Sequence, residues 1–175
     1  MLLGRIANKK TVIALLHELL KDSSRSDREL GKVIGVSQPT VSKTKKQLLE
    51  EGTIEGFTMI PNFPEIGYNL LALTFVKIKN ILSSPGEHQK TTESIKDWLN
   101  KQPNVVFADY CRGMEVDAFM ISFHESYQDF DKFINKHNQE LGNQLKDVKN
   151  ILVNLAGDET LKDFHFKYLA SNMKQ

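Results

Sequence analysis

A polar and basic segment between Ser37 and Gln47 carries side chains that could bind a nucleic acid. From Ser37 to Leu49 there are three lysines and no acid. Lysine ammonium groups pair with phosphates and with guanine acceptors, and hydroxyl or amide side chains read base edges. On a helical wheel Val41 and Leu48 share one face. The opposite face predicts a DNA-reading surface of Ser37, Gln38, Pro39, Thr40, Ser42, Lys43, Lys46 and Gln47.

The elements around this segment are expected to hold that surface outward. Ser26 and Glu29 have the spacing of a capping box, which begins a short helix, and Gly35 supplies a tight turn. Ser37 caps the next helix, which has a proline in its first turn and ends at Gly52. A short helix, a glycine-containing turn and a second helix are the helix-turn-helix signature. Residues 53–60 are expected to form a strand or wing.

Lysines on an isolated polar helix are usually only solvated, so the order of the elements and the charge distribution matter. Residues 1–60 hold ten Lys/Arg and seven Asp/Glu, a net charge of +3. The other 115 residues hold thirteen and fifteen, a net charge of −2, on a chain whose total is +1. A basic segment on an otherwise neutral protein is typical of phosphate contacts. Together these features favour double-stranded DNA as the partner.

The second half of the chain predicts an α+β domain. Strands are expected over 70–79, 105–111, 118–125 and 151–156, and helices around 95–99 and from Ser126 onward. Residues 81–90 are expected to form a loop, and 164–169 a further element. The order β-α-β-β-α-β is the ferredoxin-like arrangement. The expected domains are a helix-turn-helix domain at 1–60, a linker at 61–69 and a ferredoxin-like dimerisation and effector domain at 70–175.

The strand expected over 70–79 is apolar on both faces, with Leu71, Leu73 and Phe75 on one of them. Helices cover only one face of such a sheet, and an apolar second face needs another cover. A second copy of the same sheet is the simplest candidate. We therefore expect a homo-oligomer that assembles through the C-terminal sheet.

Composition and residue spacing exclude several other classes. No stretch reaches the roughly 20 apolar residues of a membrane span, and the N-terminus lacks the pattern of a signal peptide, so a cytoplasmic protein is expected. The single cysteine, Cys111, can form neither an internal disulfide nor a zinc site alone. The five histidines are scattered, and His137 lies on the apolar stripe of its helix. No metal or cofactor is expected, because phosphate-loop and nucleophile-elbow motifs are also missing.

Two segments, Gly35–Lys43 and Leu48–Phe57, resemble the leucine-responsive regulatory protein/AsnC family of transcriptional regulators. The run Pro64–Tyr68 resembles that family's short turn before its ligand domain, and the C-terminal element order is that of its effector domain. The resemblance implies homodimers joined through the C-terminal sheets and often assembled further. It also implies palindromic operators and amino-acid effectors held between dimers.

An effector site is expected around one turn of the C-terminal domain. Asp109, Glu115 and Asp117 cluster there with Gly113. Their carboxylates could bind the amine of an effector, although acidic turns are usually only solvated, and both interpretations stay open.

An enzyme on the same two-domain scaffold is the alternative function. The sirohaem decarboxylases resemble this regulator family and use the C-terminal domain for catalysis, where histidine and arginine grip the carboxylates of the tetrapyrrole. Arg112 and His124 would have to play those parts here. The C-terminal half contains only this one arginine, a poor supply for such a substrate. The expected function is therefore a DNA-binding transcriptional regulator and not an enzyme.

Overall fold

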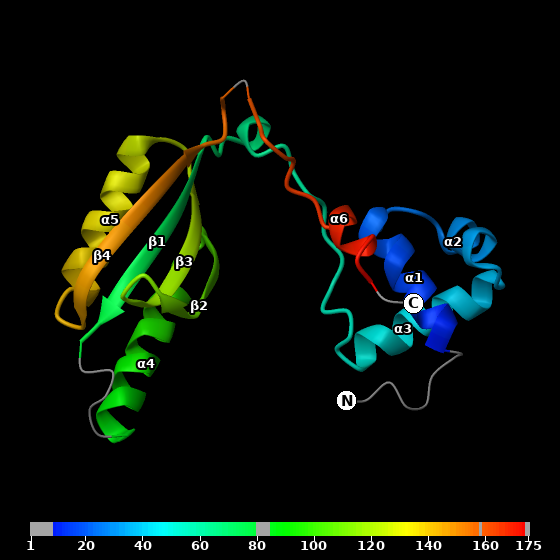
Figure 1. Cartoon of the computed structure of the whole chain (residues 1–175), viewed down its shortest axis with the longest axis horizontal. Coiled ribbons are helices and arrows are strands. Elements are labelled where there is room, and N and C mark those ends of the chain that lie inside the picture. The colour runs from blue at the N-terminus through cyan, green and yellow to red at the C-terminus, as the bar shows by residue number, and fades with distance from the viewer. Residues whose placement is uncertain (1–8, 80–84, 158, 174–175) are drawn as a thin grey trace. The chain divides into compact units, whose positions relative to one another are not determined.

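The chain folds as two units, one of which combines both ends of the sequence (Figure 1). A computed structural model describes residues 9–79, 85–157 and 159–173. The N-terminal unit takes its residues from 1–60 and from 161–175, and the C-terminal unit is formed from residues 61–160.

The N-terminal unit is a small helical domain around one apolar core. Its helices are α1 (Lys9–Lys21), α2 (Asp27–Ile34), α3 (Gln38–Glu50) and the short α6 (Lys167–Ala170). The core is built by apolar side chains from the first three helices, namely Val12, Leu15, Leu19, Leu30, Val41 and Leu48. The two helices and the turn expected from the sequence are present with the expected caps.

Two expectations about this unit were wrong. Residues 53–60 form no strand, because no other strand of the described chain pairs with them. Ile54 N–H instead donates to the Leu48 carbonyl at the end of α3. The segment after Leu161, expected in the C-terminal domain, belongs to the N-terminal unit instead. The physical reason is that α6 packs on α1 and buries Ala170 to 1% exposure.

The C-terminal unit is a four-stranded antiparallel sheet with helices α4 and α5. Its elements are β1 (Leu70–Ile78), α4 (Pro85–Leu99), β2 (Val105–Gly113), β3 (Val116–His124), α5 (Tyr127–Leu141) and β4 (Leu145–Asn154). The strand order is β2-β3-β1-β4, so the expected ferredoxin-like arrangement is confirmed. The expected loop over 81–90 was partly wrong, since α4 already begins at Pro85, while residues 80–84 lie outside the described part. Strand β4 begins at Leu145 rather than near 151.

The residues expected to form a linker pack against this sheet. The short 3-10 turn η1 spans Pro64–Ile66, and the ring of Phe63 stacks on Phe123 with centroids 4.3 Å apart. Tyr68 meets the same Phe123 ring edge-on at 6.0 Å. Asn69 is held through its backbone and its side chain. Its backbone carbonyl accepts the Leu155 N–H, and its side-chain amide donates to the Glu125 backbone carbonyl. The segment 61–69 is therefore folded onto the C-terminal unit.

The two faces of the sheet differ in what covers them. The inner face packs with α4 and α5 around Leu70, Ala72, Met120 and Trp98. The other face, which we call the outer face, carries Leu71, Leu73 and Phe75 of β1 with their neighbours on the flanking strands. Apart from Phe123, which Phe63 and Tyr68 cover, the outer face is apolar and accessible, with exposures of 48% for Phe107, 52% for Ile151 and 41% for Val153.

A buried carboxylate, Glu18, joins α1 to the start of α2. Its oxygens lie 2.8 Å from Lys21 Nζ, 2.6 Å from the Arg25 guanidinium and 3.1 Å from His17 Nδ1. The hydrogen bond from Lys21 is the largest cause that lowers the pKa of Glu18 to about 2, from an ordinary value of 4.5, against the opposing effect of burial. The folded state therefore stabilises the ionised carboxylate of Glu18 relative to the unfolded chain.

Replacing Glu18 by Gln is expected to destabilise the N-terminal unit by about 2 kcal/mol at neutral pH. The full shift would correspond to roughly 3 kcal/mol, and part of it is screened because Lys21 and Arg25 are partly solvated. The folded-state pKa is depressed, so the contribution is complete above pH 4.5 and is lost as the pH falls toward 2. Urea unfolding, followed through the NMR signals of the α1 amides, measures the free energy of unfolding of the N-terminal unit. The difference in this free energy between wild type and variant should become smaller over that pH range. Glu55→Gln, at an exposed position, is the control, and a difference independent of pH would contradict the assignment.

Candidate nucleic-acid interface

Helix α2 and the turn that follows it are fixed by a capping box and two glycines. The Ser26 hydroxyl accepts the Glu29 N–H at 3.3 Å while the Glu29 carboxylate accepts the Ser26 N–H at 2.8 Å, which confirms the capping box. Bonds from the Ser26 side chain, then its backbone, hold the pKa of Glu29 below its ordinary value. Gly35 ends α2 at φ 75°, a left-handed conformation that favours glycine. Gly31, which the sequence analysis missed, lies against the Val36 carbonyl.

Ser37 is the N-cap of helix α3, as expected. Ser37 accepts the Thr40 N–H at 3.4 Å, and its hydroxyl also lies 2.8 Å from the Thr40 hydroxyl. Pro39 falls in the first turn, where its missing N–H breaks no helical bond. Ser37 and Thr40 therefore bond to each other and fix the start of the helix.

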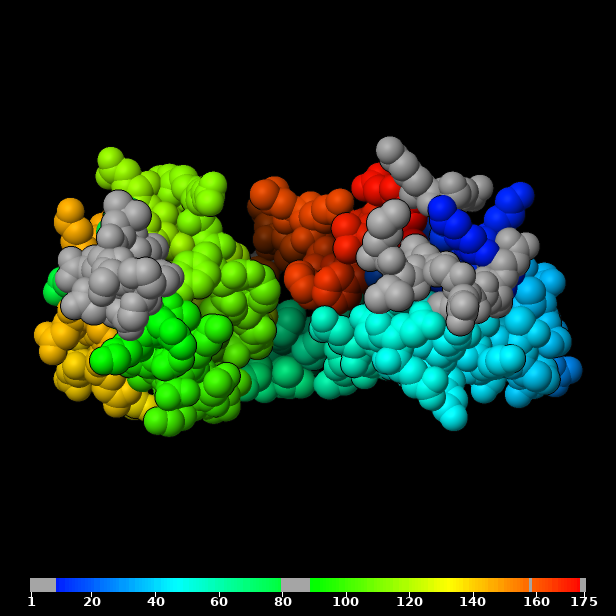
Figure 2. Space-filling view, turned by 90° about the horizontal axis from the view of Figure 1, so that it is seen from below, coloured from blue at the N-terminus to red at the C-terminus, as the bar shows by residue number. Residues whose placement is uncertain are grey.

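One face of α3 is buried and the other is exposed to solvent. Val41, Thr44 and Leu48 are 1%, 2% and 0% exposed, and the Thr44 hydroxyl donates to the Thr40 carbonyl. On the other side, Gln38, Pro39, Ser42, Lys43 and Lys46 are exposed, while Thr40 and Gln47 are half-buried. Figure 2 shows that α3 lies at the surface of its unit. The structure thus brings the eight predicted residues together on the accessible side of one helix.

The cations of α3 differ in what they contact. Lys45 points inward, forms an ion pair with Asp27 at 2.9 Å and lies over the Phe57 ring at 5.1 Å, so it ties α3 to the start of α2. Lys46 pairs loosely with Glu50 at 3.8 Å, with both side chains well exposed. Lys43 forms no ion pair with any carboxylate in the described part of the chain. The inward role of Lys45 was not predicted, although its offset of half a helical turn from Lys43 was the available signal.

The two ends of α3 carry opposite chemistry. Gln47 donates to Glu51 at 3.1 Å, and Glu50 and Glu51 follow at the C-terminal end. The N-terminal half presents Gln38, Ser42 and Lys43 without any acid. A phosphate is attracted to the positive N-terminal half of a helix and repelled by carboxylates. The arrangement favours contact with DNA through the first half of α3.

The residues expected around the effector turn are placed differently from one another. Gly113 ends β2 at φ 127°, and Glu115, at φ 60°, lies exposed in the turn to β3. Asp117 is already bonded, to Lys77 Nζ at 2.8 Å and to the Ile78 N–H at 2.9 Å. Burial raises its pKa, but these two bonds together hold the pKa of Asp117 below its ordinary value. Asp109 accepts the N–H of Tyr110 at 2.7 Å.

The residues that an enzyme of the alternative kind would need are far apart. Arg112 lies beside the turn where Gly113 pairs with Val116, whereas His124 lies at the other end of β3. That length of strand separates them by roughly 25 Å, at the usual rise per residue. The two side chains therefore cannot grip one substrate together within a protomer.

His124 instead belongs to a polar series in which it and Ser122 are buried and Asp129 is half-exposed. Ser122 Oγ lies 2.8 Å from His124 Nε2, and His124 Nδ1 lies 3.2 Å from an Asp129 carboxylate oxygen. The order of groups is that of an acyl-transfer triad, but Ser122 and His124 are both 0% exposed, so no substrate reaches the hydroxyl. Burial lowers the pKa of His124, and Asp129 opposes that effect. The series ties β3 to the start of α5.

Metal ligation and membrane crossing find no support among the described residues. They contain no cluster of three or more His, Cys, Asp or Glu side chains placed to hold a metal ion. None of the described helices combines the length and the apolar character that a membrane crossing requires.

Comparisons with known proteins assign the family. No protein-family model matches the chain. The chain is 39% identical over 96 residues to the HTH-type transcriptional regulator LrpA of Pyrococcus abyssi. The matched residues cover 54% of this chain and 68% of LrpA. The transcriptional regulator NMB0573 of Neisseria meningitidis, solved in complex with L-Met, has a TM-score of 0.73 at 18% identity and covers 89% of this chain and 95% of its own. AsnC of E. coli has a TM-score of 0.67 at 15% identity, over 90% and 98%. The chain belongs to the Lrp/AsnC family of HTH-type transcriptional regulators.

Proposed function

We propose that this chain binds specific sequences of double-stranded DNA by laying the exposed face of α3 in the major groove, and that it has no enzymatic activity of its own. The observation that carries the proposal is the division of α3 into a buried face at Val41, Thr44 and Leu48 and an accessible face at Ser42 and Lys43. The major groove is wide enough for one helix. Lys43 and Lys46 would contact phosphates or guanine, and Ser42 and Gln38 would read base edges.

The operator would be palindromic, because the reading unit would be a symmetric dimer. The apolar outer face of the sheet, with Ile151 at 52% exposure, supports pairing of two copies through β1 and its neighbours. A two-fold dimer presents two copies of α3, and the half-sites then lie about one helical turn of DNA apart.

An amino-acid effector would act on the C-terminal unit at the turn between β2 and β3. The complex of NMB0573 with L-Met, a protein of the same fold, supports an amino acid as the ligand. Glu115 in the turn and Asp109 nearby offer exposed carboxylates for an ammonium group, and Gly113 leaves the backbone accessible. Asp117 would act through its bonds to β1 rather than on the ligand.

Changing Lys43 and Lys46 together to Ala is expected to flatten the salt dependence of DNA binding. The operator is first selected from random duplex DNA, and binding is then titrated at several salt concentrations. Each phosphate that a lysine no longer neutralises reduces the steepness of log K against log salt concentration by about 0.9. A dimer loses two lysines from each protomer, so its slope should become less steep by about 3.6. The affinity at low salt should fall by at least tenfold.

Lys132→Ala/Lys136→Ala removes two exposed lysines from α5 of the other unit and is the matched control. It should leave the slope within error of the wild type. An unchanged slope for the α3 variant would show that α3 does not face the phosphates. A selection that yields no common sequence would contradict specific recognition.

A further inference from the structure

A cavity lies inside the C-terminal unit, between α4 and the inner face of the sheet. Its volume is about 130 Å³. The walls are mainly apolar and come from all four strands and both helices, including Val76, Ile95, Leu99 and Met120. A dry cavity of roughly 150 Å³ is large enough to bind benzene, so this space admits the body of a molecule with about five to seven heavy atoms. The cavity lies on the opposite side of the sheet from the outer face.

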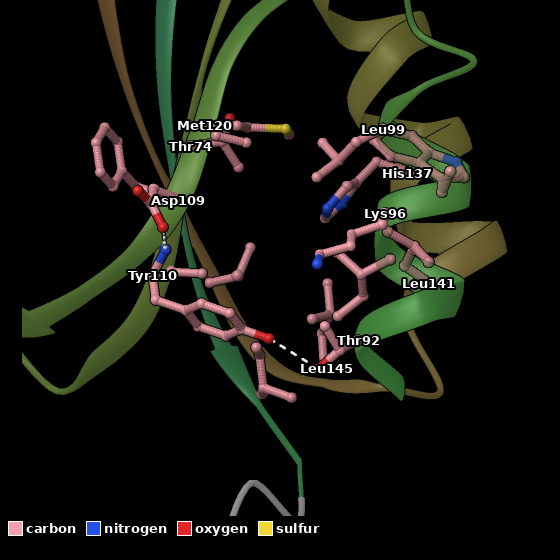
Figure 3. Close-up of a pocket in the computed structure, with 17 residues that line it drawn as sticks. Thr74, Thr92, Lys96, Leu99, Asp109, Tyr110, Met120, His137, Leu141 and Leu145 are labelled. Carbon is pink, nitrogen blue, oxygen red and sulfur yellow. Dashed lines mark hydrogen bonds between the residues drawn. The ribbon is translucent and has the colours of Figure 1, made fainter. Parts of the chain in front are cut away.

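The cavity opens to solvent beside Lys96, Thr92 and Tyr110. Figure 3 shows the Lys96 side chain reaching from α4 into the space between helix and sheet. The Thr92 and Tyr110 hydroxyls are 2.8 Å apart and join α4 to β2 at the same opening. No ion pair connects Lys96 to a carboxylate of the described residues. The opening therefore presents one uncompensated ammonium group above an apolar space.

Deeper in the cavity lies the ring of His137, one nitrogen of which has no hydrogen-bond partner among the described residues. His137 is 2% exposed, and its Nδ1 lies 3.1 Å from Asn138 Oδ1, which can only accept. Nδ1 therefore carries the proton, and Nε2 presents a lone pair for which the described residues record no partner. Burial lowers the pKa of His137, which favours the neutral ring, and the bond to Asn138 opposes that effect. Figure 3 shows this ring among the side chains that line the cavity.

We propose that this cavity binds a small, mainly apolar monocarboxylate that carries no ammonium group, with its carboxylate at Lys96 and its hydrocarbon body against Met120 and Leu99. A carboxylate gains a charge-assisted hydrogen bond at Lys96, and the hydrocarbon replaces water on an apolar wall. Among the described lining residues, Asp109 already accepts the Tyr110 N–H and the Thr92 and Tyr110 hydroxyls bond to each other, so His137 Nε2 is the acceptor without a partner. An ammonium group on the same skeleton would bond to it once, and its other N–H groups would lose their water. A hydroxyl in that place would be satisfied by His137 alone.

The chain contains its own reporter for this site. Trp98 is the single tryptophan, is 6% exposed and lines the cavity. Ligand entry therefore changes the fluorescence of one residue, and no other tryptophan obscures the signal. The site is separate from the exposed face of α3 and shares only Asp109 with the turn proposed for an amino-acid effector, so the test depends on neither.

The experiment titrates the full chain with three probes that share one carbon skeleton: 3-methylbutanoate, its neutral amide and L-valine. We expect 3-methylbutanoate to saturate the Trp98 signal with a Kd on the order of 1 mM, the range for so small a ligand. The amide and L-valine should each bind at least tenfold more weakly. Lys96→Gln should raise the Kd of 3-methylbutanoate to that of the amide and leave the amide unchanged.

Two further variants complete the design. Lys90→Gln, on the same helix but away from the cavity, is the matched control and should change nothing. Ala108→Leu fills the cavity from β2 and should abolish the response to every probe, with thermal unfolding to check that the domain still folds. The proposal is overturned if no probe saturates the signal at tens of millimolar. It is also overturned if L-valine binds as tightly as 3-methylbutanoate, or if Lys96→Gln or folded Ala108→Leu leaves binding unchanged.

Discussion

Ile151→Glu is expected to convert the chain into a monomer and to lower its affinity for a palindromic operator by at least a hundredfold. Ile151 lies near the middle of β4, directly opposite Leu73 of β1, and is 52% exposed on the outer face. In the proposed dimer this position is covered by the partner sheet, where an unpaired carboxylate costs several kcal/mol. A monomer binds only one half-site and lacks the affinity gained by linking two.

The oligomeric state is measured by sedimentation equilibrium, and operator binding by titration on the same samples. Tyr127→Glu is the matched control, since Tyr127 is an apolar side chain of similar exposure at the start of α5 and off the sheet. It should leave both properties unchanged. If Ile151→Glu stays dimeric at micromolar concentration, the outer face is not the interface, and the symmetric reading unit must assemble elsewhere.

The parts of the structure that follow from local chemistry were predictable. Ser26 with Glu29 and Ser37 with its proline begin their helices because each cap satisfies N–H groups that a helix leaves unbonded, whatever the rest of the chain does. Strand β1 was recognisable because its apolar residues recur on both faces. The accessible face of α3 followed from Val41 and Leu48 alone.

Other features depend on contacts that spacing does not reveal. The first turns of α4 carry few apolar residues after Pro85, so no helical periodicity of apolar residues indicated the helix before Ile95. Residues 53–60 have the composition of a strand, but a strand needs a partner, and Ile54 bonds to α3 instead. The segment after Leu161 offers aromatic residues to either core, and only the fit of Ala170 against α1 decides between them.

The candidate nucleic-acid interface on α3 also has features that the sequence predicts and features that it does not. Which residues share the exposed face of α3 was readable from the sequence, but their pairings were not. Lys45 and Lys46 are adjacent and chemically alike, yet one is bound to Asp27 while the other stays in solvent. Gly31 carried a signal that was overlooked, since a glycine inside a short helix often marks a close approach of backbone.

Gly31→Ala is expected to destabilise the N-terminal unit by about 2 kcal/mol and to displace α3 from its reading position. A Cβ built on Gly31 lies 2.7 Å from the Val36 carbonyl oxygen and 3.5 Å from the backbone of Ser37 and Gln38. These atoms are backbone, and the Val36 N–H also bonds to the Gly31 carbonyl at 2.9 Å, so the turn cannot yield without losing that bond. Alanine is favoured over glycine inside a helix by up to about 1 kcal/mol, and the steric cost must exceed that gain.

Urea unfolding of the N-terminal unit and operator binding under folding conditions measure the two effects separately. Gly56→Ala is the matched control, because its added Cβ meets nothing within 4 Å and its φ is not left-handed. Gly35→Ala, at φ 75°, should cost about 1 kcal/mol through backbone strain alone and leave α3 in place. If Gly31→Ala is as stable as the wild type and binds the operator equally well, then the approach of α2 to the turn does not set the position of α3, and the caps at Ser26 and Ser37 must do so alone.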